Sequence, residues 1–120
     1  MDLQEHPSPN CNDRPVDVAI DMVILHYTGM QTATAALDRM CDAAADVSAH
    51  YMVDEDGTVY RLVPEDRRAW HAGVSYWQGA TNINDRSIGI EIVNPGHEFG
   101  YPRFPEAQMT AVEQLLSDIV

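Results

Sequence analysis

The most apolar run of the chain extends from Val18 to Gly29, and its pattern predicts a buried central strand. Short runs rich in Val, Ile and Leu are typical of strands rather than helices. Because side chains alternate between the two faces of a strand, His26 shares a face with the apolar positions before it, which are Val18, Ile20, Met22 and Ile24. In α/β sheets, catalytic and binding residues often lie at the carboxyl ends of such strands. His26 is therefore a candidate functional residue, and the alternative is a buried histidine satisfied by one hydrogen bond.

A second run, from Ser87 to Asn94, predicts another buried strand with isoleucines on one face. Glu91 lies on the other face together with Ser87 and Gly89. A carboxylate inside a buried strand is costly unless it is paired or faces a cavity. We expect Gly89 to make room beside Glu91, which makes Glu91 a candidate catalytic acid. The alternative is a structural ion pair with an arginine.

Two stretches have the period of amphipathic helices. Residues 32–42 place one apolar stripe on a helix face, formed by Ala33, Ala36, Leu37, Met40 and Cys41. A second helix is expected from Pro105, because proline is tolerated at the first helical position. Its predicted buried stripe consists of Met109, Val112, Leu115, Leu116 and Ile119. The two helices and the strands together predict an α/β fold.

A hairpin is expected between these helices. Strands at 50–54 and 58–63 flank Glu55-Asp56-Gly57, and Asp-Gly is a strong hairpin signal. Residues 65–85 follow without a clear period, and long loops in compact domains are usually functional or disordered. This loop contains Trp70, His71, Tyr76 and Trp77. Its aromatic residues line either a groove for sugar or peptide, or a small separate core.

The composition excludes several classes of function. Seven Lys plus Arg against 19 Asp plus Glu give a formal net charge of −12, which disfavours binding to nucleic acid. No apolar run is long enough to span a membrane. Residues 1–17 are rich in Pro, Asn and Asp and predict an irregular N-terminal arm without a secretory signal. Cys11 and Cys41 show no metal or redox spacing, so free thiols in the cytoplasm are expected, or the periplasm if a leader has been removed.

Five stretches in a fixed order carry a resemblance to a known family. They begin at Val23 (Val-Ile-Leu-His-Tyr-Thr), at Val47 (Val-Ser-Ala-His-Tyr-Met-Val-Asp-Glu-Asp-Gly-Thr-Val-Tyr), at Arg68 (Arg-Ala-Trp-His-Ala-Gly-Val-Ser), at Asn84 (Asn-Asp-Arg-Ser-Ile-Gly-Ile-Glu-Ile) and at Pro105 (Pro-Glu-Ala-Gln-Met). The chain resembles the zinc-dependent N-acetylmuramoyl-L-alanine amidases, which are related to peptidoglycan recognition proteins and phage T7 lysozyme. The resemblance implies a mixed central β-sheet flanked by helices, with residues 18–120 forming the catalytic domain.

The resemblance also implies the chemistry of the site. His26 matches a zinc ligand, and Glu91 matches the acid that moves a proton beside the metal. The reaction is hydrolysis of the amide between N-acetylmuramic acid and L-alanine, in peptidoglycan or in a soluble muropeptide. Zinc can activate a water for this attack, and a carboxylate can carry its proton. Trp70, His71, Tyr76 and Trp77 are expected to bind substrate, and His50 to have either a structural or a groove role.

The chain departs from the family near its end. The family's second and third zinc ligands follow the last helix, so they are expected beyond Val120, and no Gly-His-Ser/Cys-Asp stretch occurs here. We therefore expect a domain whose C-terminal part is missing, with weak zinc binding and no turnover, because a catalytic zinc needs three protein ligands. One alternative is a metal-free muropeptide-binding module. Another recruits His50, His71 or His97 as replacement ligands. The oligomeric state is not readable from the sequence.

Overall fold

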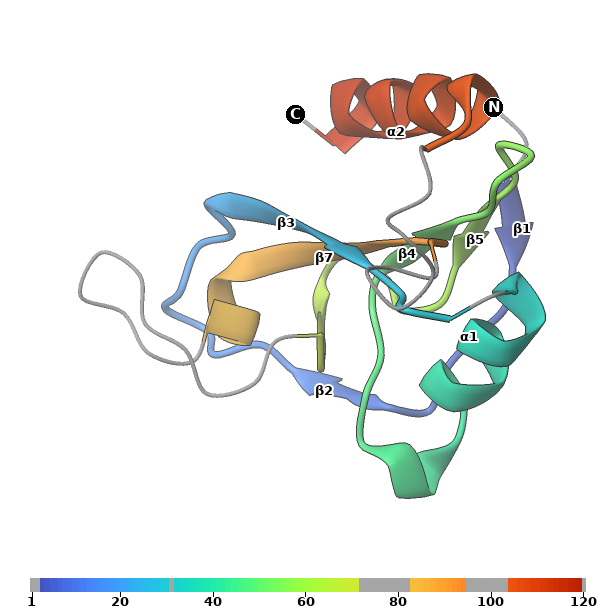
Figure 1. The fold of residues 1–120 in the computed structure, drawn as a ribbon. Helices are drawn as coiled ribbons and strands as arrows, with labels where there is room; N and C mark the ends of the chain where they lie inside the picture. The colour runs from blue at the N-terminus through green and yellow to red at the C-terminus, as the bar shows by residue number, and fades with distance from the viewer. Residues whose placement is uncertain (1–2, 31, 72–82, 95–103, 120) are drawn as a thin grey trace.

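The computed structural model describes residues 3–30, 32–71, 83–94 and 104–119, in which a five-stranded sheet lies between two helices (Figure 1). The strand order is β1-β5-β4-β7-β3. The strands are β1 (Leu3–Glu5), β3 (Met22–Tyr27), β4 (Tyr51–Val53), β5 (Val59–Arg61) and β7 (Ser87–Ile92). β4 and β5 pair antiparallel, and the other neighbouring pairs are parallel. This mixed sheet confirms the predicted α/β fold class.

The two helices cover opposite faces of the sheet (Figure 1). α1 (Ala33–Met40) begins after Thr32, whose side-chain oxygen accepts a hydrogen bond from the backbone N–H of Ala35. This is the expected N-cap geometry. Four of the five predicted stripe residues are buried, whereas Cys41 follows the helix and is half-buried. α2 (Glu106–Ile119) begins directly after Pro105, as predicted. It packs on the isoleucine face of β7, where the buried residues are Tyr51, Val53, Val59, Ile88, Ile90, Ile92, Ala111, Val112 and Leu115.

The predicted hairpin is present, because β4 and β5 pair around the turn that contains Gly57. Gly57 has a φ of 92°, a conformation that glycine adopts without steric cost. The predicted position of the first apolar run is wrong. Its strand begins only at Met22 and lies at the edge of the sheet, not at its centre. Leu25 and Tyr27 are 48% and 50% exposed, so an apolar composition here accompanies a half-buried edge.

The prediction of an irregular N-terminal arm is also wrong in part. β1 joins the main sheet, and β2 (Cys11–Asp13) pairs with β6 (Arg67–Ala69) in a separate two-stranded sheet. β6 also interrupts the loop that was predicted for residues 65–85. Buried Asn10 holds the arm in place, because its side-chain amide contacts the carbonyl oxygens of Met40, Asp42 and Val47. These strands have three residues each and few apolar side chains, so hydrophobic periodicity could not reveal them.

Arg14 connects the N-terminal arm to the first residue of β7, Ser87. Its guanidinium donates hydrogen bonds to four carbonyl oxygens, those of Glu65, Asn84, Asp85 and Ser87. Two short 3-10 helices, η1 (Ala43–Ala45) and η2 (Ile83–Arg86), complete the described elements. Both cysteines are free thiols. Across the described residues, no helix has the length and apolar character needed to cross a membrane.

Candidate functional site

The two residues that the sequence singled out lie side by side on neighbouring strands. His26 of β3 is the register partner of Glu91 of β7. In a parallel pair, register partners project from the same face of the sheet. Both stand near the carboxyl ends of their strands, on the face that α1 covers. The site therefore combines an imidazole and a carboxyl group at one edge of the sheet.

A chain of hydrogen bonds determines which ring nitrogen of His26 carries the proton. The Ser87 hydroxyl donates to the Ile83 carbonyl oxygen at 2.8 Å, so it can only accept from His71 Nε2 at 2.9 Å. Neutral His71 then has an acceptor at Nδ1, which lies 3.1 Å from His26 Nε2. We infer that His26 Nε2 donates this bond. The lone pair of His26 is therefore on Nδ1.

Gly89 makes this arrangement sterically possible. A Cβ at this position would lie 2.3 Å from Cγ of His71 and 2.7 Å from its Nδ1, well inside van der Waals contact. The prediction that Gly89 makes room for Glu91 is wrong, because the imidazole of His71 occupies this space. Only a residue without a side chain allows the ring to approach.

The site disfavours charge on its titratable groups. Burial raises the pKa of Glu91 from 4.5 to about 7. Burial is also the largest of the effects that lower the pKa of His71 to about 3, and it lowers the pKa of His26. The structural ion pair considered for Glu91 does not form among the described residues, whose ion pairs all involve other carboxylates. A carboxyl group with a pKa near 7 can both accept and release a proton at neutral pH.

His50 has the structural role, which was one of the two that the sequence left open. Its side chain is fully buried, and Nδ1 accepts a hydrogen bond from the backbone N–H of Gly89 at 3.0 Å. The neutral ring then carries its proton on Nε2, which lies 2.9 Å from the carbonyl oxygen of Arg67. Burial lowers the pKa of His50 to about 4. The ring is therefore enclosed and engaged among the described residues, and a contact of His50 with substrate stays a prediction.

The remaining candidates have different outcomes. His71 is buried, and both of its ring nitrogens are used within the site. The Trp70 indole N–H donates to Oδ1 of Asn12 on β2 at 3.2 Å, and its contact with a substrate stays a prediction. Three candidates lie outside the described residues, namely Tyr76, Trp77 and His97.

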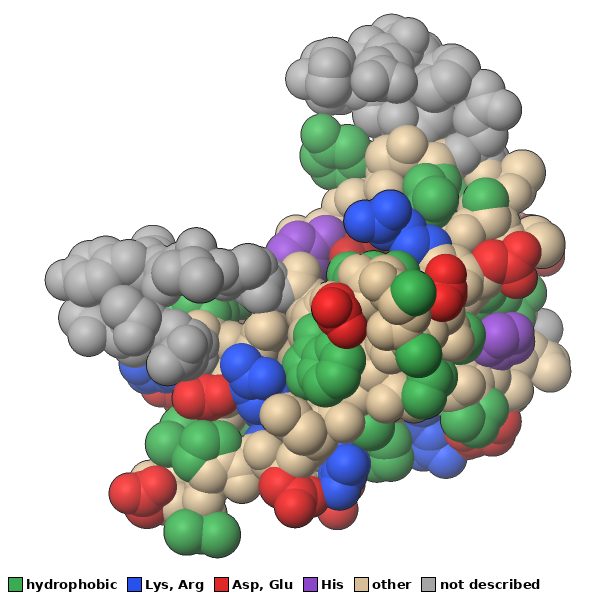
Figure 2. All heavy atoms as spheres, turned by 90° about the horizontal axis from the view of Figure 1, so that it is seen from below, with side chains coloured by type: hydrophobic (Ala, Val, Ile, Leu, Met, Phe, Trp, Pro, Cys, Tyr) green, Lys and Arg blue, Asp and Glu red, His purple; other side chains and the backbone are tan. Residues whose placement is uncertain are grey.

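A small cavity of about 50 Å³ opens beside Glu91, between the end of the sheet and α1. Figure 2 looks onto the α1 side of the molecule, where acidic and basic side chains are interspersed. The residues that line this cavity are Thr28, Met30, Ala36, Arg39, Met40, Val47 and Glu91. Sequence reasoning missed Arg39 and Ser87. In the sequence, Arg39 is a basic residue in the last turn of an amphipathic helix, which is common. The role of Ser87 depends on its contact with His71, which is distant in sequence.

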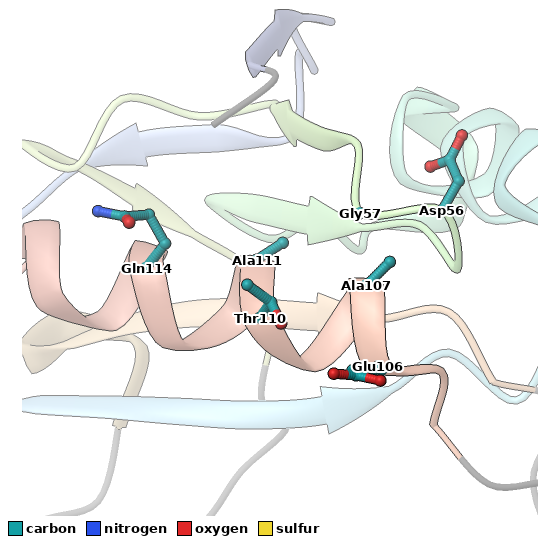
Figure 3. Close-up of a pocket in the computed structure, with 7 residues that line it drawn as sticks. All are labelled: Asp56, Gly57, Glu106, Ala107, Thr110, Ala111 and Gln114. Carbon is teal, nitrogen blue, oxygen red and sulfur yellow. The ribbon is translucent and has the colours of Figure 1, made fainter.

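A second depression, an open groove of about 610 Å³, lies between α2 and the β4–β5 turn (Figure 3). Its lining consists of Asp56, Gly57, Glu106, Ala107, Thr110, Ala111 and Gln114. None of the predicted site residues is among them. The register pair of His26 and Glu91 therefore lies on the α1 side of the sheet, away from this larger groove.

The described residues do not supply a complete zinc site. Within them, no three His, Cys, Asp or Glu side chains are grouped so that they could hold a metal ion. The bonding pattern leaves His26 Nδ1 as a possible ligand, whereas both nitrogens of His50 and His71 are already engaged. A catalytic zinc takes three protein ligands. The described donor set therefore does not fit this ion, and the replacement of the missing ligands by His50 or His71 conflicts with their hydrogen bonds.

The expected position of the other two zinc ligands is not covered by the structure. They were predicted beyond Val120, and Val120 itself lies outside the described residues, which end at Ile119 of α2. This part of the metal assignment therefore stays a prediction. Of the predicted ligand set, only His26 has a described position.

Comparison with known proteins identifies relatives of this site. Residues 14–120 match the family model described as N-acetylmuramoyl-L-alanine amidase. The chain is 36% identical over 113 residues to N-acetylmuramoyl-L-alanine amidase AmiD of Escherichia coli, covering 84% of this chain and 40% of AmiD. It is 33% identical over 129 residues to 1,6-anhydro-N-acetylmuramyl-L-alanine amidase AmpD of the same organism, covering 93% of this chain and 70% of AmpD.

A solved structure is similar as well. It is the complex of E. coli AmiD with the substrate anhydro-N-acetylmuramic acid-L-Ala-D-gamma-Glu-L-Lys. The TM-score is 0.72 at 35% sequence identity, and the match covers 93% of this chain and 44% of the AmiD chain. The present chain thus spans less than half the length of AmiD and about two thirds of AmpD.

Proposed function

This chain belongs to the N-acetylmuramoyl-L-alanine amidase family, and from that premise we propose that its site hydrolyses the amide between N-acetylmuramic acid and L-alanine. The observation that carries the proposal is the register pair of His26 and Glu91 on one face of the sheet. The substrate class is a peptidoglycan fragment, by similarity to AmiD and AmpD. The free thiols favour a reducing compartment, so we propose a cytoplasmic location.

Glu91 is the proposed acid-base group. In its ionised form it accepts a proton from the water whose oxygen attacks the amide carbonyl carbon. It then donates that proton to the nitrogen of L-alanine as the C–N bond breaks, which yields a carboxylic acid and a free amine. Since burial raises the pKa of Glu91 to about 7, both protonation states are accessible at neutral pH. The same carboxyl group can therefore serve both steps.

His26 is the proposed electron-pair donor of the site. His71 holds its Nε2–H, so Nδ1 carries the lone pair that a ligand would meet. The family's zinc would require two further protein ligands, which the described residues do not provide. Weak zinc binding by the 120-residue chain stays a prediction that calorimetric titration with zinc tests.

A second candidate function is muropeptide binding without catalysis. The observation that favours it is the described donor set, because His26 alone is too few ligands for a catalytic zinc. A protein of this kind would bind the fragment on the surface around Glu91 on the α1 side of the sheet. Only the amidase cleaves the amide bond, and only for the amidase should Glu91→Gln lower a rate of cleavage.

The test combines calorimetric binding with detection of the released amine, using anhydro-N-acetylmuramyl-L-Ala-D-γ-Glu-L-Lys as ligand. We expect the 120-residue chain to bind it without turnover, and a chain extended to include the two ligands predicted beyond Val120 to cleave it with zinc present. In the extended chain, Glu91→Gln, which keeps the size of the side chain, should bind equally well but lose at least about 100-fold in rate, as is typical when a general acid-base group is removed. Binding without cleavage by the extended chain at any zinc concentration would favour the binding module. The absence of binding would refute both functions.

A further inference from the structure

Five of the six described arginines of this acidic chain are engaged by contacts within the protein. All seven basic residues are arginines, against 19 acidic residues. Of the six described arginines, four form ion pairs with carboxylates, and Arg14 is bonded to backbone carbonyls. Arg39 is the exception, since its guanidinium makes no ion pair or side-chain hydrogen bond with another described residue. Its cationic group is thus available to a ligand.

The location of Arg39 connects it to the site. It lies in the last turn of α1 and lines the same small cavity as Glu91. In the described part of the chain, it is the only arginine among the residues of that cavity. A net charge of −12 creates a field that repels anions. A negatively charged substrate therefore needs a local cation near Glu91, and Arg39 is placed to supply one.

The substrate class has the matching group. In a peptide written L-Ala-D-γ-Glu-L-Lys, the γ-linkage leaves the α-carboxylate of glutamate free, and the last residue ends in another carboxylate. Guanidinium binds carboxylate through two parallel hydrogen bonds, which makes Arg specific for this group. We propose that Arg39 binds a peptide carboxylate of the muropeptide and so selects fragments with an anionic peptide. This inference rests on the proposed function and adds a specificity residue to it.

A purely structural role for Arg39 makes different predictions. A cation in the last turn of a helix also interacts favourably with the helix dipole. In that case Arg39→Gln would change stability slightly and would not distinguish between ligands. Selective loss for the carboxylate form of a ligand is expected only if the guanidinium touches that carboxylate.

The experiment titrates three chains with two ligands by calorimetry. The ligands are anhydro-N-acetylmuramyl-L-Ala-D-γ-Glu-L-Lys and the same molecule with both peptide carboxylates converted to amides. The chains are wild type, Arg39→Gln and the control Arg61→Gln. The control makes the same change in net charge at Arg61 on β5, which pairs with Glu5, is separated from β7 by β4 and does not line the cavity beside Glu91. Thermal melting checks that each variant is folded.

We expect Arg39→Gln to bind the carboxylate ligand about tenfold more weakly than wild type, which corresponds to about 1.4 kcal/mol. It should bind the amide ligand as wild type does, and Arg61→Gln should bind both ligands normally. Equal binding of the carboxylate ligand by Arg39→Gln and wild type would overturn the inference. Equal weakening by both substitutions, or for both ligands, would overturn it too. Failure of wild type to bind either ligand would refute the proposed function itself, which is a distinct result.

Discussion

Gly89→Ala should disrupt the site without touching any titratable group directly. The new methyl group would lie 2.3, 2.5 and 2.7 Å from three ring atoms of His71. Separations below 3.0 Å are not sustained by real atoms, so the imidazole must move. Its movement would break the bond to His26 at 3.1 Å and the bond to Ser87 at 2.9 Å. The substitution thus tests whether these contacts hold the site together.

The expected cost follows from the two effects. Overpacking of a buried site costs about 1–3 kcal/mol, and each lost hydrogen bond contributes about 0.5–1.5 kcal/mol. Alanine recovers about 0.5–1 kcal/mol relative to glycine through backbone entropy. The free energy of unfolding should therefore fall by roughly 1–5.5 kcal/mol, out of a typical total of about 5–15 kcal/mol. The melting temperature should drop by at least about 3 °C.

A double-mutant cycle separates the clash from other effects. His71→Ala removes the ring and both of its hydrogen bonds, so Gly89→Ala should cost at least about 2 kcal/mol less in that background. Chemical denaturation of the four proteins gives this coupling energy. In the wild type, long-range ¹H–¹⁵N NMR should find the proton of His26 on Nε2, and Gly89→Ala should change that signal. Additive effects within about 0.5 kcal/mol, with an unchanged His26 tautomer, would refute the reasoning.

Four further outcomes are expected from denaturation experiments. Arg14→Met should lower the free energy of unfolding by about 2–4 kcal/mol, because part-buried carbonyls lose a charged donor, and a cost below about 1 kcal/mol would contradict its bonding role. The low pKa of His50, about 4, means that the unfolded state binds its proton first, so this residue should reduce stability by about 2 kcal/mol between pH 7 and pH 5. The contribution of Glu91 to stability has the opposite sign, because the folded state binds its proton at a higher pH than the unfolded state, and this stabilisation is lost as pH rises through about 7. The free energy of unfolding should therefore fall more steeply between pH 7 and pH 5 in Glu91→Gln than in wild type. Arg61→Gln should change stability by less than about 1 kcal/mol, because its ion pair with Glu5 is exposed, and a larger loss would argue against that estimate.

Patterns along the sequence predicted the main helices and strands and singled out His26 and Glu91. The period of two in residues 87–94 gave the faces of β7, and the helical period gave α1 and α2. The same alternation placed His26 and Glu91 each on a definite face of its strand. Local rules suffice for these features, because the pattern of side chains along one element is set by the geometry of that element.

The strand partners and side-chain contacts around these residues depend on the tertiary structure. The short strands β1, β2 and β6 depend on partners distant in sequence, and β3 has the composition of a central strand but lies at the sheet edge. The contact of His71 with His26, and the position of Arg39 beside Glu91, join segments whose separation along the chain gives no local signal. Hydrogen bonds and close packing between distant segments are set by the whole fold, which no pattern within one element can encode.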